Sequence, residues 1–199
     1  GVFTITGGTL DRSGVTNAGH TLGLGWDNAT GRAELNVNGG VINNSGVGGI
    51  VNYGAGGGTT TGVLNLNAGT LITKSFTKVA GTTAYLNFNG GTLQSASTST
   101  IFLPALTGAY VNGAFGAFAG GAVFNTNGFD DTVAASLLAP TGNGLTSVPV
   151  TNGGTGYIGA PYVSITGGTG ATAIANMIDD GTGNGTLAIG SITVTNPGI

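Results

Sequence analysis

The sequence has no cysteine, a single histidine and very little charge. Without cysteine there is neither a disulfide framework nor thiol chemistry. Only four Lys or Arg and seven Asp or Glu occur in 199 residues. Nucleic-acid binding needs clustered basic side chains to displace phosphate counterions. The basic residues Arg12, Arg32, Lys74 and Lys78 are dispersed along the chain, so this composition argues against a nucleic-acid partner.

Long hydrophobic runs and helix signals are also scarce. No stretch approaches the 18 consecutive apolar residues of a membrane-spanning helix. No apolar stripe with the 3.6-residue period lasts a dozen residues, and the helix formers Glu, Lys, Gln and Met are few. The sequence therefore predicts an all-β chain with no helix longer than two turns, and no membrane-spanning helix.

Glycine is abundant instead, with 42 residues, and the hydrophobic residues make up 40% of the chain. They alternate with polar residues, most clearly in Ala84–Ser95. In an extended segment Leu86 and Phe88 point to one face, while Asn87 and Asn89 point to the other. A Gly-Gly turn then ends the run. This pattern is typical of a β-strand that buries one face.

The same phrase occurs at Phe3–Leu10, Leu35–Ile42 and Leu64–Leu71. The first turn residues of the four copies are 32, 29 and 22 residues apart. Recurrence at this period predicts stacked repeats, each burying its apolar face on its neighbours. We expect the Asn residues to form hydrogen-bonded ladders, and the outward Asn, Thr and Ser to provide solubility. The predicted inner face consists of Leu35, Val37, Leu64, Leu66, Leu86 and Phe88.

Residues 96–139 depart from this phrase. Asn127-Gly128 is the strongest two-residue signal for a β-hairpin, so we expect a hairpin to close the repeats of residues 1–139. Pro140–Gly144 then has the composition of a linker.

Residues 140–199 contain a second repeat, because Val150–Asn152 and Val194–Asn196 share a sequence 44 residues apart. We expect a smaller Gly-rich β repeat module that is incomplete at its C-terminal end. Its predicted strands are Pro161–Thr166, Ala171–Ile178 and Leu187–Thr195.

The phrases LNLNAGTL and LNFNGGTLQ, the close FNTNGFDDTVAASLLAP and the module TNGGTGYIGAP resemble the bacterial autotransporter-associated β-strand repeat family. The resemblance covers most of the chain. It implies a right-handed parallel β-helix in an exported or cell-surface protein, with no catalytic residues on the repeat.

Few residues suit catalysis or metal binding. His20 could pair with an acid, but a polar loop residue is the simpler interpretation. The loop after Asp179 and Asp180 has the composition of a calcium loop, yet it lacks the terminal Glu of an EF-hand. Turn residues are therefore the simpler interpretation of this loop. We therefore predict no enzyme activity and no required cofactor, with calcium near Asp179 and Asp180 as the alternative.

The favoured hypothesis is a structural extracellular or bacterial cell-surface protein: a repeat segment of an adhesin, sheath or self-assembling filament. Both ends of the sequence resemble joints, so its expected partners are other copies end to end or further repeats of the same chain. The alternative is a carbohydrate- or surface-binding module with stacking side chains at Trp26, Tyr53, Tyr157 and Tyr162. A polysaccharide lyase would need several acids and bases lining one groove, which this sequence does not supply.

Overall fold

The computed structural model describes residues 1–26, 30–55, 59–166 and 170–198, apart from the side chains of residues 26 and 55. Sixteen strands and no helix occur in these ranges, which confirms the all-β prediction. None of the described residues forms a helix that is long and apolar enough to cross a membrane. The chain divides into two compact units, residues 1–139 and 140–199.

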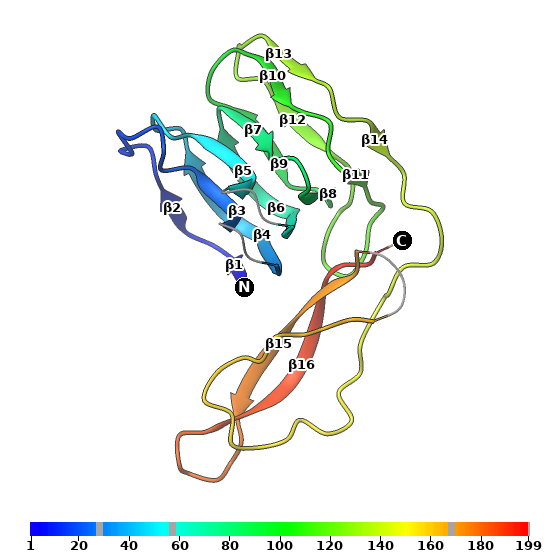
Figure 1. Ribbon diagram of the computed structural model, residues 1–199. Helices are drawn as coiled ribbons and strands as arrows, with labels where there is room; N and C mark the ends of the chain where they lie inside the picture. The colour runs from blue at the N-terminus through cyan, green and yellow to red at the C-terminus, as the bar shows by residue number, and fades with distance from the viewer. Residues whose placement is uncertain (27–29, 56–58, 167–169, 199) are drawn as a thin grey trace. The chain divides into compact units, whose positions relative to one another are not determined.

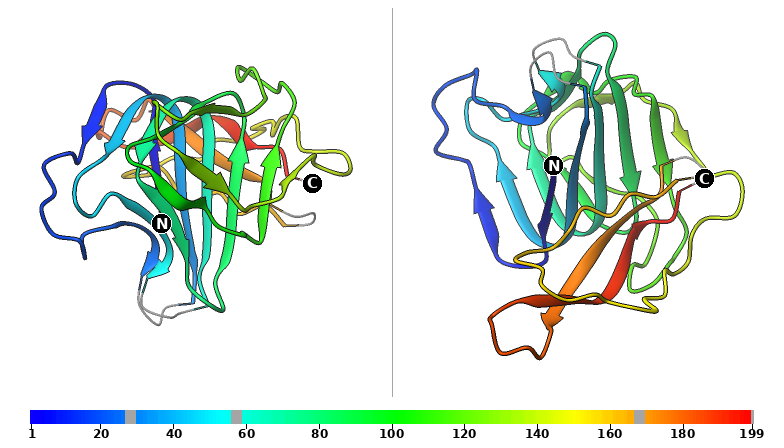
Figure 2. Two further views of the ribbon diagram at one scale, coloured as in Figure 1. Left: turned by 90° about the horizontal axis from the view of Figure 1, so that it is seen from above. Right: turned by 60° about the horizontal axis from the view of Figure 1, so that its bottom comes forward.

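The largest sheet of the first unit is built from strands that pair side by side in the order of the chain (Figure 1). Every pairing in it is parallel. In Figure 2 the colours of neighbouring strands accordingly change from blue through cyan to green. Its main path consists of β1 (Val2–Ile5), β4 (Arg32–Asn44), β6 (Thr61–Thr73), β8 (Thr83–Phe88), β11 (Gly108–Val111) and β14 (Leu137–Leu138).

The register of these strands follows the spacing of the repeated phrase. Thr4 lies beside Asn36 at an offset of 32 residues, and the next two partners, Asn65 and Asn87, follow at offsets of 29 and 22. Because side chains alternate along a strand, any other register would mix apolar and polar residues on one face. The three predicted spacings are therefore the three strand-to-strand offsets.

The second glycine of the repeated turn is fixed by backbone geometry. Gly40 and Gly69 have φ angles of +69° and +71°, a conformation that side chains other than glycine rarely adopt. A Cβ on Gly69 would lie 2.4 Å from the carbonyl oxygen of Gly40 in the preceding repeat. The turns of successive repeats therefore stack too closely for any larger residue.

Further parallel pairings extend the repeats beyond each turn. In the same sheet, β2 (Thr9–Asp11) pairs with β4, and β9 (Thr92–Ser95) pairs with both β6 and β12 (Val123–Asn125). A separate sheet contains β3 (Leu22–Trp26), β5 (Ile50–Ala55) and β7 (Ser75–Lys78). Another consists of β10 (Ser99–Leu103) and β13 (Asp131–Val133).

The predicted hairpin at Asn127-Gly128 is wrong, although the turn itself is present. Both residues have positive φ, and the amide of Phe129 donates to the carbonyl of Thr126 at 2.9 Å. However, β12 before the turn pairs in parallel with β9, and β13 after it pairs in parallel with β10. The turn therefore connects strands of two different sheets, because each strand continues the stack of the preceding repeat.

The core of the first unit contains the apolar residues of the repeated phrase. Leu35, Val37, Leu64, Leu66, Leu86 and Phe88 all belong to one buried cluster. Phe124 of β12 packs on Phe88 with ring centroids 5.1 Å apart. Hydrophobic burial on this face stabilises the stack.

The second unit contains one antiparallel ribbon, β15 (Thr172–Asp179) paired with β16 (Leu187–Asn196). These strands match two of the three predicted in this part of the chain. The predicted strand at Pro161–Thr166 is wrong, because the structure has no strand there. The alternating apolar and polar residues of that segment therefore do not mark a strand.

Candidate functional site

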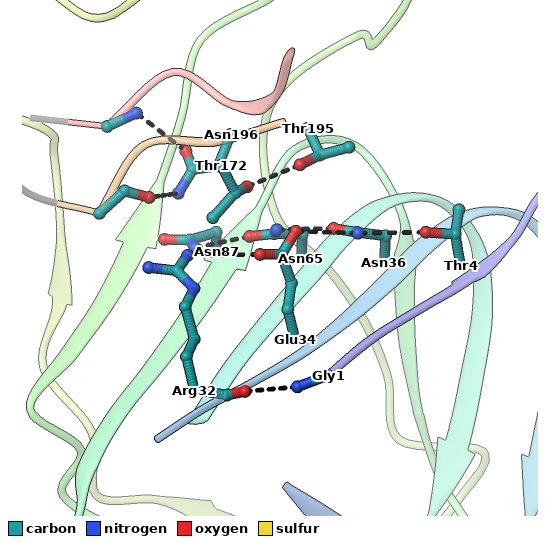
Figure 3. A network of polar contacts seen from close by, with 12 residues as sticks. Gly1, Thr4, Arg32, Glu34, Asn36, Asn65, Asn87, Thr172, Thr195 and Asn196 are labelled. Carbon is teal, nitrogen blue, oxygen red and sulfur yellow. Dashed lines mark hydrogen bonds and ion pairs between the residues drawn. The ribbon is translucent and has the colours of Figure 1, made fainter. Parts of the chain in front are cut away.

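A row of hydrogen-bonded amides crosses the central strands of the first unit (Figure 3). The side chain of Asn87 donates to Asn65 at 2.7 Å, and Asn65 donates to Asn36 at 2.7 Å. Asn36 in turn donates to the hydroxyl of Thr4 at 3.2 Å and to Glu34 at 2.9 Å. The predicted ladder is therefore confirmed, and it links four successive repeats.

A second ladder lies two residues further along the same repeats, with Asn89 and Asn112 directly after β8 and β11. Asn67 donates to Asn38 at 2.7 Å. Asn89 donates to Asn67, and Asn112 donates to Asn89. In every bond between two Asn side chains of these ladders the donor belongs to the later repeat and the acceptor to the earlier one, so the ladders have a direction.

The expectation that outward Asn side chains provide solubility is wrong for these ladders. Asn36, Asn65, Asn67, Asn87 and Asn89 are all buried. Their amides bond to one another along the stack, since each repeat presents both a donor and an acceptor at the same height. They therefore contribute to cohesion between repeats.

The apolar column next to the first ladder is open at both ends. Leu35, Leu64 and Leu86 are at most 2% exposed, whereas Phe3 at one end is 52% exposed and Leu137 at the other is 44% exposed. All five residues occupy the same register position, each on its own strand of the large sheet. Both strands, β1 and β14, are edges of the sheet. Edge strands carry unpaired backbone groups that can accept another strand.

The four aromatic residues predicted for glycan stacking differ in their exposure, as far as the structure describes their side chains. Tyr53 is fully buried, with its hydroxyl donating to the carbonyl of Tyr85 at 3.1 Å, so it cannot stack on a sugar. Trp26 is the last residue of β3, and its side chain lies outside the described part. Tyr162 is 55% exposed and Tyr157 is half-buried. No observation therefore favours the glycan-binding hypothesis.

The loop predicted as an alternative calcium site is held by protein donors. The Asp180 carboxylate accepts hydrogen bonds from the amides of Gly156 and Thr182, both at 3.0 Å, and from the hydroxyls of Thr182 and Thr186, both at 2.7 Å. These bonds, led by that of the Gly156 amide, hold the pKa of Asp180 well below its usual value. Asp179 accepts the amide of Gly181 at 2.7 Å. A calcium ion would have to displace these donors.

His20 is exposed in the loop before β3. Its backbone carbonyl accepts the guanidinium of Arg12 at 2.6 Å, and its amide donates to Asn17. Among the described residues no three His, Cys, Asp or Glu side chains gather closely enough to hold a metal ion. His20 is therefore placed as a polar loop residue.

Sequence reasoning missed a cavity of about 90 Å³ next to Asp131. Both carboxylate oxygens of Asp131 are shielded from solvent, and in the part of the chain that the structure describes they have no hydrogen-bond partner. The available signal was the period-2 alternation of β13, which places Asp131 on the same side as Val133. The cavity is lined by Leu93, Ser95, Phe102, Phe124, Asn125, Thr126, Asp131 and Val133.

No protein-family model, no curated protein and no solved structure matches this chain.

Proposed function

We propose that the chain is a structural repeat segment of an extracellular or bacterial cell-surface protein, and that residues 1–139 form a right-handed parallel β-helix. The in-register parallel pairing of successive repeats supports this architecture. Connections between parallel strands of one sheet are right-handed in nearly all proteins, which supports the handedness. The resemblance to the autotransporter-associated β-strand repeat family supports the location.

The role of the segment is to stack with further repeats of the same kind, in a second copy or in the same polypeptide. The open apolar column carries this proposal. Phe3 and Leu137 are about half exposed, while their partners inside the stack are buried. A parallel strand placed on β1 or β14 would cover these side chains and pair with the backbone groups of the edge.

The self-association of the purified chain tests the proposal. We expect sedimentation velocity to show assembly that increases with concentration across the micromolar range. Phe3→Lys should abolish it, because a charge at the centre of the contact would be buried without a partner. Ile101→Lys is the matched control, since Ile101 is 54% exposed on β10, which belongs to a different sheet from β1 and β14.

Two results would contradict the proposal. One is a chain that remains monomeric at every concentration. The other is assembly that Phe3→Lys and Ile101→Lys affect equally, because the association would then not involve the edge formed by β1. Electron microscopy of the assembled material distinguishes end-to-end filaments from amorphous aggregates.

A further inference from the structure

The first and the last complete repeat of the first unit present matching sets of strands. At one end β1, β2 and β3 follow one another, with β1 and β2 paired to β4 and β3 paired to β5. At the other end β11, β12 and β13 follow one another, paired to β8, β9 and β10. All these pairings are parallel, so the strands of one end have the order and direction needed to continue those of the other.

β14 is the exception to this match. It pairs with β11 through only two register positions, Ala109 with Leu137 and Tyr110 with Leu138. It thus begins a further repeat, but within the described part of the chain no strand covers β12 or β13 in the same way. A second copy whose β1 paired with β14 would therefore leave a gap one strand wide between its β2 and β12, and between its β3 and β13. The backbone groups facing that gap would stay unpaired, which is costly.

The side chains suit the arrangement in which β1 of a second copy takes the place of β14 on β11. In the register of the stack, Phe3 of the second copy would then lie over Ala109. Leu10 of its β2 would lie over Phe124 of β12. Both pairs are apolar, so this joint continues two columns of the core without burying a charge in either of them.

The turns at the two ends also have room for each other. Inside the stack consecutive turns touch, since a Cβ on Gly40 would lie 2.4 Å from the carbonyl oxygen of Gly8. Gly121 belongs to the last of these turns, because its carbonyl accepts the amide of Gly90 at 2.9 Å. Among the described residues, a Cβ on Gly7, Gly8 or Gly121 would meet nothing within 4 Å. Both end turns therefore border the open space that a neighbouring turn would occupy.

From these features we infer that β1 of a second copy displaces β14 and pairs with β11, while its β2 and β3 add to β12 and β13. The inference rests on the proposed self-association and specifies its joint. Within one chain β1 forms four register positions with β4, against the two that β14 forms with β11. Leu137 and Leu138 are already 44% and 42% exposed, so their release gives up little apolar burial. β14 is thus a strap that competes with assembly.

Disulfide cross-linking between single-cysteine variants of the full chain tests the joint. The inferred register places Thr4 of one copy beside Tyr110 of the next, at a strand spacing of about 4.8 Å that a disulfide can bridge. A mixture of Thr4→Cys and Tyr110→Cys should therefore give a mixed dimer on mild oxidation, identified by its intact mass. Thr4→Cys mixed with Leu138→Cys is the matched control, because a joint on β14 would bring this pair together instead.

A double variant tests the displacement of β14 itself. Tyr110→Cys combined with Leu138→Cys joins register partners of β11 and β14 within one chain. Its oxidation should raise the concentration at which half of the chain is assembled at least about tenfold, and reduction should restore assembly. Gln94→Cys combined with Asn125→Cys is the matched control, since it joins β9 to β12 and leaves β14 free.

Two results would overturn the joint and leave the proposed self-association intact. One is cross-linking of Thr4→Cys to Leu138→Cys, or to itself, in preference to Tyr110→Cys. The other is undiminished assembly of the oxidised Tyr110→Cys and Leu138→Cys double variant. A wild-type chain that stays monomeric at every concentration would contradict the joint and the self-association together. If the double variant failed to fold, the cross-linking of the single variants would still decide.

Discussion

Replacing Asn65 by alanine should destabilise the first unit more than any surface substitution. Asn65 is the central member of its ladder, donating to Asn36 and accepting from Asn87, both at 2.7 Å. Alanine removes both bonds and leaves an acceptor on Asn36 and a donor on Asn87, both of which are buried. An unsatisfied buried group costs about 1–3 kcal/mol. The two together predict a loss of about 2–6 kcal/mol in the free energy of unfolding.

Asn125→Ala is the matched control, because it also removes two hydrogen bonds, both exposed: the amide of Asn125 donates to Gln94 at 3.2 Å, and its side-chain oxygen accepts the backbone amide of Asn127 at 2.9 Å. Water can replace both bonds, so we expect a loss of less than about 1 kcal/mol. Urea denaturation measures both variants, and an unchanged m-value would show that the same surface is exposed on unfolding. Equal losses for Asn65→Ala and Asn125→Ala would refute the cohesive role of the ladder.

Three further predictions concern single side chains. Phe88→Ala should cost about 3–5 kcal/mol of unfolding free energy, because Phe88 is fully buried; Phe3→Ala, at an exposed position, should cost far less by the same denaturation assay. Asp180→Asn should speed the hydrogen exchange of the two amides bound to the carboxylate more than Asp179→Asn does. Because the folded pKa of Asp180 lies below its unfolded value of 3.8, this stabilisation is present above that pH and is lost as pH falls through the folded pKa. Protection of the two amides, measured relative to the unfolded chain at each pH, that does not fall with acidification would contradict it. Burial raises the pKa of Tyr53 above its usual 10.0, so its ionisation favours the unfolded chain. The free energy of unfolding should therefore fall as pH rises above that value. If tyrosinate absorbance showed that Tyr53 titrates normally in the folded chain, its side chain would be exposed and the prediction wrong.

The sequence predicted the central repeats well because three constraints coincide in them. The Leu and Phe positions, the ladder Asn positions and the close glycine turns all recur at the same spacing, so the register of β1, β4, β6 and β8 could be derived. The continuation of the repeat from β11 to β12 was missed for a physical reason. The offset between stacked partners rises from 23 residues at Asn112 to 31 at Asn125. Residues 113–119 form a loop outside the stack, with Phe115 packed on Phe118, and the amide of Gly120 rejoins the stack by donating to Asn89.

The Asn127-Gly128 turn shows why local signals mislead here. Turn chemistry fixes the backbone at the two central residues, but the partner of each flanking strand depends on what the preceding repeat offers. The Asp131 cavity was hidden for the same reason. Whether a carboxylate finds a donor depends on how two sheets meet, and no spacing in the sequence reports that.

The parallel stacking of repeats is the basis of the whole account, and disulfide formation in this cysteine-free chain tests it directly. Gln94 and Asn125 are register partners in the parallel pair of β9 and β12, and neighbouring strands lie about 4.8 Å apart, within disulfide reach. We predict that Gln94→Cys combined with Asn125→Cys forms an intramolecular disulfide on mild oxidation. Asn125→Cys combined with Asp130→Cys, the pair that a hairpin at Asn127-Gly128 would bring together, should not. The opposite pattern would contradict the stacked register.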